Sequence, residues 1–485
     1  MTINITIDDF LAILPMLIVV GWACLLLLID LFIPKDRKGL TAFLAATGLV
    51  VALGFNLASA GQEKSAFNDM VVVDGFANFL NLIFLGSGLM GIGLAYDYLK
   101  RMEIERGEYY TLLLFTISGM MLMATAADLI VIFLALELLS IPLYVLAGFA
   151  RPRLESEESA MKYFLLGAFA GGFVVYGIAL VYGATGTTSL SMIAQAVSAG
   201  EINLTLMSFG AALILVGLGF KVAAVPFHMW TPDVYHGAPS AVTAFMAVGA
   251  KTGGFAALLR VFIVAFPALS VDLEPIIWAI AALTMIVGNI VAIAQRNIKR
   301  MLAYSSIAHA GYILMAFVPY GQDAVMRETA ASALFYLMAY AITNFGAWAV
   351  VIAMERREGE GLSIDDYAGL GKKHPAMAAA MLVFMLSFTG VPPTLGFLGK
   401  FYVFRTVIQA GYIWLAIIGG LTSLISAYYY LRIVIIMYMQ DGDPESRSEI
   451  WLNLATFATA IGTVVLTFFA APLFDWAARA VMLLF

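Results

Sequence analysis

Three lysines in strongly apolar segments are the residues of this chain best suited to carry chemistry. Lys221 lies in LGFKVAAVPF, Lys251 in AVGAKTGGF and Lys400 in TLGFLGKFYVF. An ammonium group at the centre of a membrane helix costs about 2.5–3.5 kcal/mol on insertion scales, so a lysine kept there is expected to serve a function. Lysine also changes its protonation state readily when buried, which suits it to carrying a proton. The three side chains therefore predict an ion or proton pathway through a membrane.

Prolines interrupt the sequence close to two of these lysines. Pro226 follows Lys221 by five residues, and Pro392 and Pro393 precede Lys400. Within a helix, proline removes a backbone donor and clashes with the carbonyl one turn back. Transporters build sites near the middle of the membrane from such broken helices. We therefore expect both lysines to lie on interrupted helices.

Glu137 is the carboxylate that the pathway would use. It lies in DLIVIFLALELLSIPLYVLAGF, and its distance from Asp128 at the start of that segment corresponds to a depth of roughly 13 Å along a helix. If Glu137 faces Lys221, each stabilises the charged form of the other, and a change in their separation shifts both protonation equilibria. Such a pair can load and release a proton. The alternative is a fixed ion pair that only holds two helices together.

Two histidines are further candidates. His228 follows Lys221 by seven residues, which on a continuous helix is two turns along the same face, so it could link the lysines to water. A packed histidine at the membrane interface is the alternative. His309 lies in AYSSIAHAGYILMAF, where serine and tyrosine share its span. That polar track could hold waters that join Lys251 to Lys400.

The composition identifies the class of protein that these residues belong to. Of the 485 residues, 62% are hydrophobic and 12% are charged, whereas soluble proteins have about 25% charged residues. Apolar runs near 20 residues indicate membrane helices rather than barrel strands. One cysteine, four histidines and no CxxC or GxGxxG motif leave little to bind a metal or a redox group. We predict an all-α polytopic membrane protein with no cofactor in this chain and no nucleic-acid partner.

Hydropathy predicts about fourteen transmembrane helices. Their expected positions are 9–33, 40–59, 75–98, 110–126, 128–150, 160–183, 204–230, 238–267, 275–295, 299–319, 328–354, 377–408, 412–438 and 451–471. An amphipathic piece at 189–200 is expected to lie at the membrane interface. Lysine and arginine collect in the loops after the odd-numbered helices, so these loops are expected on the cytoplasmic side and both termini on the other.

A weak internal repeat suggests how the helices are grouped. The seventh helix contains GLGFKVAAVPF and the twelfth contains GVPPTLGFLGKFYVF, and one further helix follows each. Units of five helices fit this spacing, and an odd-numbered unit repeated in tandem must be inverted in the membrane. The expected division is a three-helix flank at 1–105, a first repeat at 106–268, a second repeat at 269–440 and a C-terminal helix at 441–485.

Four stretches together resemble the antiporter-like membrane subunits of bacterial respiratory complex I, the proton-translocating NADH:quinone oxidoreductase. They are ALELLSIPLYVLAGF, GFKVAAVPFHMWTPDVYHGAPSAVTAFMAVGAKTGGFAALLR, QRNIKRMLAYSSIAHAGYIL and GVPPTLGFLGKFYVF. The resemblance covers roughly residues 105–440. A lysine at position 400, where subunit M-like chains usually have glutamate, and an end too early for the long extension of subunit L-like chains favour the subunit N type.

The resemblance implies fourteen helices, an inverted five-helix repeat and broken helices seven and twelve. It also implies that Glu137 pairs with Lys221, that Lys251 connects the two repeats and that Lys400 is the terminal lysine. NADH, FMN, iron–sulfur clusters and quinone would be bound by partner subunits, including a neighbouring antiporter-like subunit and small membrane subunits. Phospholipids would surround this chain in the bacterial inner membrane, with both termini on the periplasmic side.

By that resemblance the chain is a proton channel that uses the energy of electron transfer in other subunits. One alternative is the large subunit of a multi-subunit monovalent cation/proton antiporter, which shares this fold and would use the same lysines for exchange. Another is a non-pumping scaffold in which the buried charges are static. Co-purification with a large assembly that oxidises NADH would separate the first reading from the second.

Overall fold

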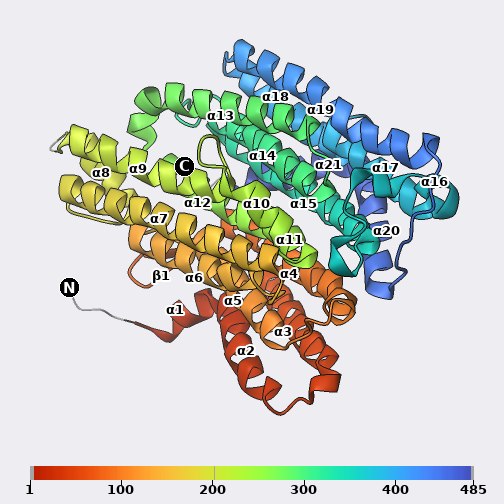
Figure 1. Ribbon diagram of the computed structural model, residues 1–485. Helices are drawn as coiled ribbons and strands as arrows, with labels where there is room; N and C mark the ends of the chain where they lie inside the picture. Colours follow the sequence, from red (N-terminus) through yellow and green to blue (C-terminus); the bar gives the residue numbers. More distant parts are fainter. Residues whose placement is uncertain (1–4, 201, 482–485) are drawn as a thin grey trace.

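The computed structural model describes residues 5–200 and 202–481, which form a helical bundle with one short β-hairpin (Figure 1). The all-α prediction is confirmed. The first half of the bundle contains α1 (Ile7–Ala12), α2 (Leu14–Asp30), α3 (Gly39–Ala58), α4 (Gly75–Arg101), α5 (Glu108–Thr125), α6 (Leu129–Ala147), α7 (Leu154–Thr185), α8 (Leu190–Ala199), α9 (Leu204–Val222), α10 (Trp230–Gly237), α11 (Ser240–Phe245) and α12 (Lys251–Ala265). The second half contains α13 (Ser270–Ile293), α14 (Ile298–Phe317), α15 (Met326–Met354), α16 (Leu370–Lys373), α17 (Pro375–Thr389), α18 (Leu395–Gln409), α19 (Ile413–Met439), α20 (Ile450–Val465) and α21 (Ala470–Ala480).

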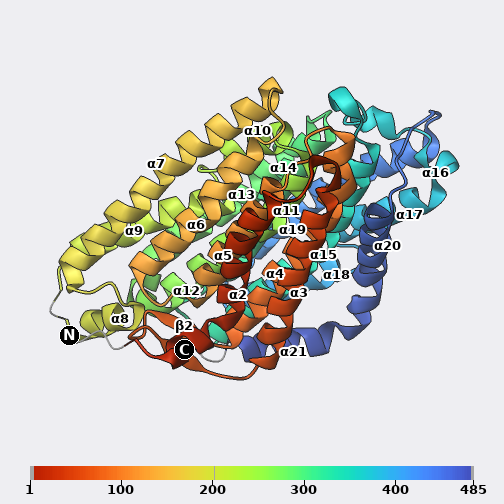
Figure 2. The ribbon, with the colours of Figure 1, turned by 90° about the horizontal axis from the view of Figure 1, so that it is seen from below.

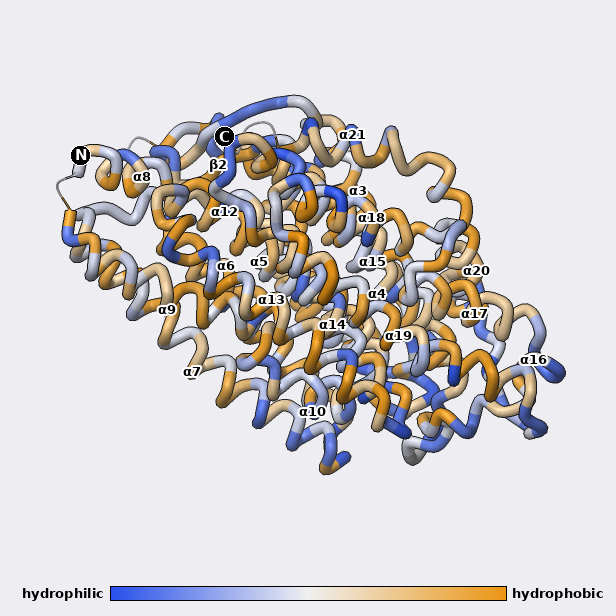
Figure 3. Tube along the Cα trace, turned by 90° about the horizontal axis from the view of Figure 1, so that it is seen from above, coloured by the Kyte–Doolittle hydropathy of each residue, from blue (hydrophilic) through white to orange (hydrophobic). Residues whose placement is uncertain are grey.

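The long helices are suited to a membrane. Among the described residues, 10 helical segments are long and apolar enough to cross a bilayer. The other four expected spans coincide with α2, α5, α14 and the interrupted pair α17 and α18. Figure 3 shows hydrophilic residues gathered toward the two ends of the bundle, around α8 and β2 at one end and α10 and α16 at the other. A hydrophobic band separates them, as a membrane protein requires.

Two segments form the centre of the bundle. The continuous segment Ser240–Ala265 joins α11 and α12 through the π-helical turn Met246–Ala250. In an apolar stretch of 18 residues within it, 94% of the residues are buried, and the corresponding share in α15 is 89%. In the segment Ile450–Ala480 the share is only 17%. Because Lys251 begins α12, it lies on one of the most enclosed segments among the described residues.

The short elements gather at the two ends of the long helices. The antiparallel hairpin of β1 (Lys64–Ala66) and β2 (Val71–Val73) and the helix α8 lie at one end, while α10 and α16 lie at the other (Figure 2). The piece at 189–200, expected to be amphipathic, contains the helix Leu190–Ala199. The C-terminal helices α20 and α21 return to pack against α4 and α15, so the chain closes on its own N-terminal half.

Close contact between α5 and α6 fixes the helix that carries Glu137. A Cβ atom added at Gly119 of α5 would lie 2.4 Å from the backbone nitrogen of Leu139 and 2.8 Å from the carbonyl carbon of Leu138. Small residues at such contacts let membrane helices approach closely. Backbone atoms cannot turn aside as a side chain can, so α6 must move if this glycine is enlarged.

Gly119→Ala is therefore expected to destabilise the protein. Overpacking of this kind costs about 1–3 kcal/mol, and the backbone clash places this case toward the upper end, above the gain of about 1 kcal/mol in helix propensity. Thermal unfolding of the purified assembly should show a lower midpoint for Gly119→Ala. Gly93→Ala on α4, where nothing lies within 4 Å of the added atom, is the matched control. Equal midpoints for the two variants would contradict the expectation.

Candidate functional site

Lys221 lies in the last turn of α9, enclosed by hydroxyl groups. Its side chain is 4% exposed, and its Nζ donates hydrogen bonds to Ser140 Oγ (2.8 Å) and to Tyr163 OH (3.1 Å). The amine also lies 5.4 Å from the centre of the Tyr163 ring. Its stem packs against Gly254 of α12, where an added Cβ would be 3.2 Å from Lys221 Cγ. The site thus joins α6, α7, α9 and α12 at one ammonium group.

Glu137 faces α7, one helical turn away from the group that holds Lys221. It is half-buried, and a Cβ added at Gly171 of α7 would lie 3.0 Å from its Oε1. Glu137 and Lys221 act on each other electrostatically, but Lys221 is anchored by Ser140 and Tyr163 rather than by an ion pair with the carboxylate. The two charges therefore lie near each other without contact.

The break after Lys221 is built so that its backbone groups keep their partners. α9 ends at Val222, and Ala223 adopts a left-handed conformation with φ of 63°. The carbonyl of Phe220 accepts a hydrogen bond from Trp230 Nε1 (3.0 Å), and Val225 N donates to Thr284 Oγ1 (2.9 Å). An interrupted helix at membrane depth is tolerated when its freed groups find such partners.

This break changes the place of His228. The spacing of seven residues from Lys221 assumes a continuous helix, and that assumption is wrong because the chain turns at residues 223–229. His228 instead lies in the turn before α10, half-buried, and its Nδ1 is buried without a hydrogen-bond partner among the described residues. The two side chains are not on one helix face.

α10, which follows the break, is tied to two neighbouring helices by its acidic residue. Asp233 accepts hydrogen bonds from Lys162 of α7 (2.7 Å) and Arg300 of α14 (2.8 Å). Partial burial would raise the pKa of Asp233, but the hydrogen bonds from these two cations outweigh it and lower that pKa. Asp233 is therefore a structural clamp that holds α10 over the ends of α7 and α14.

Lys251 follows the π-helical turn directly and reaches α14. Its side chain is 2% exposed, and its Nζ donates to both the carbonyl and the hydroxyl of Ser306. π-helical turns inside α-helices are rare and are frequent at functional sites. Gly253 and Gly254 follow two and three residues later on α12, and their lack of a side chain lets Met120 and Lys221 approach the helix closely. Lys251 thereby connects the helix that packs on Lys221 to the helix that carries His309.

A chain of hydrogen bonds continues from α14 toward the second half of the bundle. Ser305, next to Ser306, bonds to Tyr430 OH, and Tyr430 OH lies 3.2 Å from His309 Nε2. The other ring nitrogen, Nδ1, lies 2.7 Å from Tyr336 OH. Both ring nitrogens of a buried histidine are thus engaged by hydroxyls, which can donate or accept a proton. The predicted polar track along α14 exists as an array of hydroxyl and imidazole groups.

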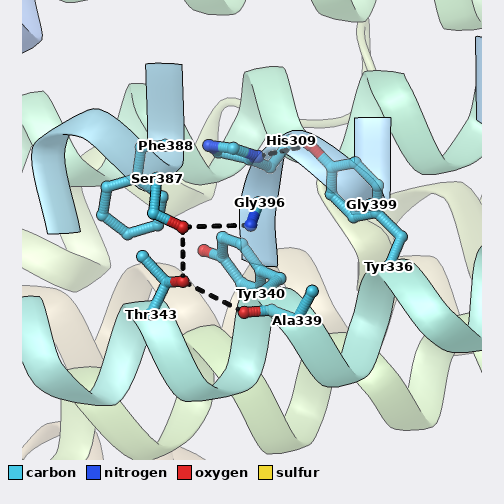
Figure 4. Close-up of a pocket in the computed structure, with 9 residues that line it drawn as sticks. All are labelled: His309, Tyr336, Ala339, Tyr340, Thr343, Ser387, Phe388, Gly396 and Gly399. Atoms are coloured by element: carbon cyan, nitrogen blue, oxygen red, sulfur yellow. Dashed lines mark hydrogen bonds between the residues drawn. The ribbon is translucent and has the colours of Figure 1, made fainter. Parts of the chain in front are cut away.

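A small cavity opens beside His309 between α14, α15, α17 and α18 (Figure 4). It has about 10 Å³ of space for the centre of a water-sized sphere, which is close to what one water molecule needs. Thr343 and Ser387, hydrogen-bonded at 2.9 Å, lie on its wall together with His309. The hydroxyl of Tyr340, also on the wall, has no hydrogen-bond partner among the described residues. The cavity is close to the size of one water, but the surface that it exposes is apolar, so the other hydroxyl groups and the imidazole of its wall are directed at one another rather than into it.

Lys400 sits at the second interruption, where α17 ends and α18 begins. Its Nζ donates to the carbonyls of Phe388 and Thr389 (2.9 Å each) and to Ser423 Oγ (2.7 Å). Those carbonyls belong to the last turn of α17, where the helix dipole favours a cation. The amine also lies 4.7 Å from the centre of the Tyr312 ring, and Tyr312 packs on His309. The buried side chain is 6% exposed.

The two interrupted helices place their lysines differently. Lys221 lies in the last turn before its break, whereas Lys400 lies in the second turn after its own. The sequence has the same order, with Pro226 after Lys221 and the pair Pro392–Pro393 before Lys400. Each lysine nonetheless lies close to the C-terminal end of a half-helix, so the favourable dipole is shared even though the positions are not.

Arg260 is buried in an ion pair and does not extend toward water. It lies on α12, 4% exposed, and both of its terminal nitrogens bond to the carboxylate of Asp74 at 2.9 Å. Asp74 also caps α4, because its side chain accepts from Ala77 N. The Arg260 guanidinium further lies 4.8 Å from the centre of the Phe76 ring.

Several functional contacts escaped the sequence analysis. Ser140, Tyr163, Tyr336, Tyr430 and Ser423 hold the lysines and the histidine. Ser140 could have been found, since it lies three residues after Glu137 and hence on the same helix face. The tyrosines and Ser423 come from other helices, and nothing in local spacing relates them to the lysines. Among residues 5–200 and 202–481, no three His, Cys, Asp or Glu side chains are grouped to hold a metal ion.

Comparison with known proteins gives the family context of this site. Residues 126–426 match the family model described as the transmembrane region of NADH:quinone oxidoreductase and the Mrp antiporter. This range includes Glu137, His309 and the buried lysines Lys221, Lys251 and Lys400. A relative from Chloroflexus aggregans, NADH-quinone oxidoreductase subunit N, is 48% identical over 476 residues, which cover 97% of this chain and 96% of the relative.

Two solved structures have the same architecture. A chain of respiratory complex I from Thermus thermophilus superimposes with a TM-score of 0.82 at 35% identity, covering 96% of this chain and 99% of that one. A chain of the Mrp complex from Dietzia sp. superimposes with a TM-score of 0.85 at 20% identity, covering 98% of this chain and 97% of that one. The second likeness shows the fold alone.

Proposed function

Because the chain belongs to the subunit N family of NADH-quinone oxidoreductase, we propose that Glu137, Lys221, Lys251 and Lys400 carry protons across the membrane. The protein is the antiporter-like, proton-translocating membrane subunit of that enzyme, in which electrons pass from NADH to quinone. Moving one charge against 100 mV costs about 2.3 kcal/mol, so this subunit must draw on that electron transfer.

The observation that carries the proposal is the row of buried amines with polar groups between them. Hydroxyl groups hold Lys221 and Lys251, and His309 with its two tyrosines lies between Lys251 and Lys400. All three lysines are at most 6% exposed, so none extends into lipid. A proton taken up by one amine can pass to the next through hydroxyls, the imidazole of His309 and waters, with each group accepting one proton and releasing another.

We further propose that the trigger is electrostatic and arrives at Glu137. Because Lys221 is not in contact with Glu137, a change of charge near that carboxylate alters the field at the amine without first breaking a bond. Glu137 lies beside an exposed apolar stripe on α6, made of Ile130, Leu134, Ile141 and Val145. Such a stripe favours a neighbouring membrane subunit or lipid at this face. A neighbouring antiporter-like subunit placed there would bring its own charges close to Glu137.

The wider setting follows from family membership. The chain is a multi-pass membrane protein whose structural relatives are parts of large membrane complexes. We propose that NADH, FMN, the iron–sulfur clusters and quinone are bound by partner subunits, and that phospholipids cover the remaining apolar faces. We place the chain in the bacterial inner membrane with its termini toward the periplasm; residues 1–4 and 482–485 lie outside the described residues.

We propose the division into a flank at 1–105, two inverted five-helix repeats at 106–268 and 269–440, and a C-terminal helix at 441–485. The interruptions at residues 223–229 in the first unit and 390–394 in the second support it. Lys251 lies near the end of the first unit and bonds to Ser306 in the second. A proton that crosses from one unit to the other would therefore pass between these two residues.

A cation/proton antiporter is the second candidate, and identity counts against it. The Mrp complex chain is 20% identical to this one, against 48% for the subunit N relative from Chloroflexus aggregans. Mild detergent extraction should recover this chain with a large assembly that oxidises NADH. A small complex with sodium/proton exchange would favour the antiporter.

Neutral replacement at Glu137 and Lys221 tests the proposed function. In the complete enzyme reconstituted into liposomes, we expect Glu137→Gln and Lys221→Met to assemble and to lose most of the proton pumping, because each variant removes one partner of the electrostatic pair. The measurements are NADH oxidation and acidification of the liposome lumen. Glu158→Gln, which alters an exposed ion pair with Lys162, is the control and should pump normally. Unaltered pumping in both of the test variants would refute the proposal.

A further inference from the structure

A fully buried carboxylate lies at the end of α15, outside the group of residues described so far. Glu355 follows α15 directly and has a relative exposure of 0%, yet neither of its carboxylate oxygens has a hydrogen-bond partner among the described residues. Its backbone N–H completes the last turn of α15 by bonding to Val351 O. The backbone N–H of Glu355 is therefore hydrogen-bonded, while its side chain is not.

Buried polar atoms without a partner gather around this carboxylate. Glu355 interacts electrostatically with Lys299 of α14, Tyr98 of α4 and Tyr367. Within residues 5–200 and 202–481, the hydroxyl of Tyr367 has no hydrogen-bond partner, and neither does that of Ser240, whose backbone N–H donates to Tyr98 OH. Lys299 is 1% exposed, and its Nζ donates to Ala238 O at 2.7 Å. Four elements thus converge on one polar region.

The charged and titratable groups that face this region come from every element around it. They are Lys299, Tyr98 and Tyr367, which act on Glu355 directly, Arg153, which acts on Lys299 and Tyr98, Arg101, which acts on Tyr98, and Asp366, which acts on Tyr367. Arg101 also donates to Ile352 O in the last turn of α15. An ionised carboxylate in this region has cations on several sides but bonds with none of them.

Such an arrangement is costly unless the carboxylate binds a proton or water. An isolated buried charge is strongly destabilising, and a buried polar group without a hydrogen bond costs roughly 1–3 kcal/mol in proteins. A carboxylate that only stabilised this end of α15 would be expected to accept hydrogen bonds from the cations beside it. Several unpartnered atoms in one region indicate ordered water, which supplies the missing bonds and conducts protons.

The polar region around Glu355 includes Lys299 of α14, and α14 is also the helix that Lys251 contacts. Lys299 and Ser306 are seven residues apart on α14, two turns along one face and about 10 Å along the axis. Ser306 accepts the hydrogen bonds of Lys251. Arg300, in the first turn of α14, and Arg356, in the loop after α15, lie at the end of the bundle that the distribution of basic residues predicts on the cytoplasmic side.

We propose that Glu355, with Lys299, forms the site at which protons enter from the cytoplasm on their way to Lys251. The carboxylate accepts a proton from water at its oxygen and becomes the neutral acid. The acid then gives that proton to water held by the hydroxyl groups beside it, and the amine of Lys251 receives a proton through Ser306. The carboxylate is left ionised for the next uptake. This inference rests on the proposed role of Lys251, but it names a different residue.

The pH dependence of turnover tests the proposal in the complete enzyme. In liposomes, added NADH reaches only those molecules whose NADH site faces the medium, so the outer pH is the cytoplasmic pH. Uptake limits the rate most when protons are scarce. Glu355→Gln should therefore resemble the parent near pH 6.5 and pump about tenfold more slowly near pH 8.5, a modest effect for a positioned acid–base group. Glu355→Asp, which keeps the acid, should recover much of the loss.

A matched control separates uptake from folding. Asp30→Asn removes another buried carboxylate, which is fully engaged by Lys38 and Thr41, so it should leave the shape of the pH profile unchanged. A parental pH profile for Glu355→Gln, alongside lost pumping in Lys251→Met, would overturn the uptake site and leave the proposed function standing. Parental pumping in both variants would overturn the proposed function as well. Failure of Glu355→Gln to assemble moves the test to Glu355→Asp and Lys299→Met, and parental pH profiles in both would overturn the uptake site.

Discussion

Lys251→Met is expected to lower proton pumping at least about 100-fold, the lower end of what a positioned acid or base contributes. Lys251 is the amine that joins α12 to α14 through Ser306, and methionine has a similar length but no group that can hold a proton. The apolar replacement also removes a desolvated charge, so folding should not suffer. Lumen acidification by the reconstituted enzyme is the measurement, with the amount of assembled complex as the reference.

Arginine at the same position separates proton transfer from static charge. Arginine keeps the positive charge but cannot give up its proton in a protein. If Lys251 only holds helices together, Lys251→Arg should preserve pumping better than Lys251→Met does. If Lys251 carries protons, both variants should be equally defective. Normal pumping with arginine would show that the amine is a structural charge.

Arg260→Met is expected to lower the free energy of unfolding more than Gly119→Ala does. The replacement leaves the Asp74 carboxylate buried without its two hydrogen bonds, and breaking a buried ion pair from one side costs about 3–5 kcal/mol. The cap that Asp74 supplies to α4 is also weakened. A lower thermal midpoint and a smaller yield of assembled complex should be observed.

Removing both charges tells a buried pair from a functional one. When apolar residues replace both partners, stability is often recovered, since no isolated charge remains. Asp74→Leu combined with Arg260→Met should therefore be more stable than Arg260→Met alone. If the double variant also pumps normally, the pair is purely structural. A double variant that is less stable than Arg260→Met would contradict the ion-pair explanation.

The fold could be predicted from the sequence because hydropathy and proline act locally. The expected spans coincide with the helices, and the interruptions fall beside Pro226 and the Pro392–Pro393 pair. Local rules failed where the chain stops being a helix. Because α9 ends at Val222, spacing along a helix could not place His228.

The partners of the buried lysines were beyond local rules for a different reason. Tyr163 is 58 residues from Lys221 in sequence, and Ser306 is 55 residues from Lys251. Only the packing of whole helices brings these groups together. Glu355 escaped because it ends a helix beside the charged loop at 356–360, where a carboxylate is ordinarily in water. Its burial depends on α4 and α14, whose positions no local pattern specifies.

The gap between Glu137 and Lys221 sets the character of their communication. Two ions in contact lose most of their attraction at the first step of separation, because a water must then enter between them. Glu137 and Lys221 are not in contact, since Ser140, one turn along α6 from Glu137, holds the amine, and their interaction energy therefore varies smoothly with distance. A change of charge near the carboxylate would then reach the amine as a gradual change in electrostatic potential, and no helix would have to move first.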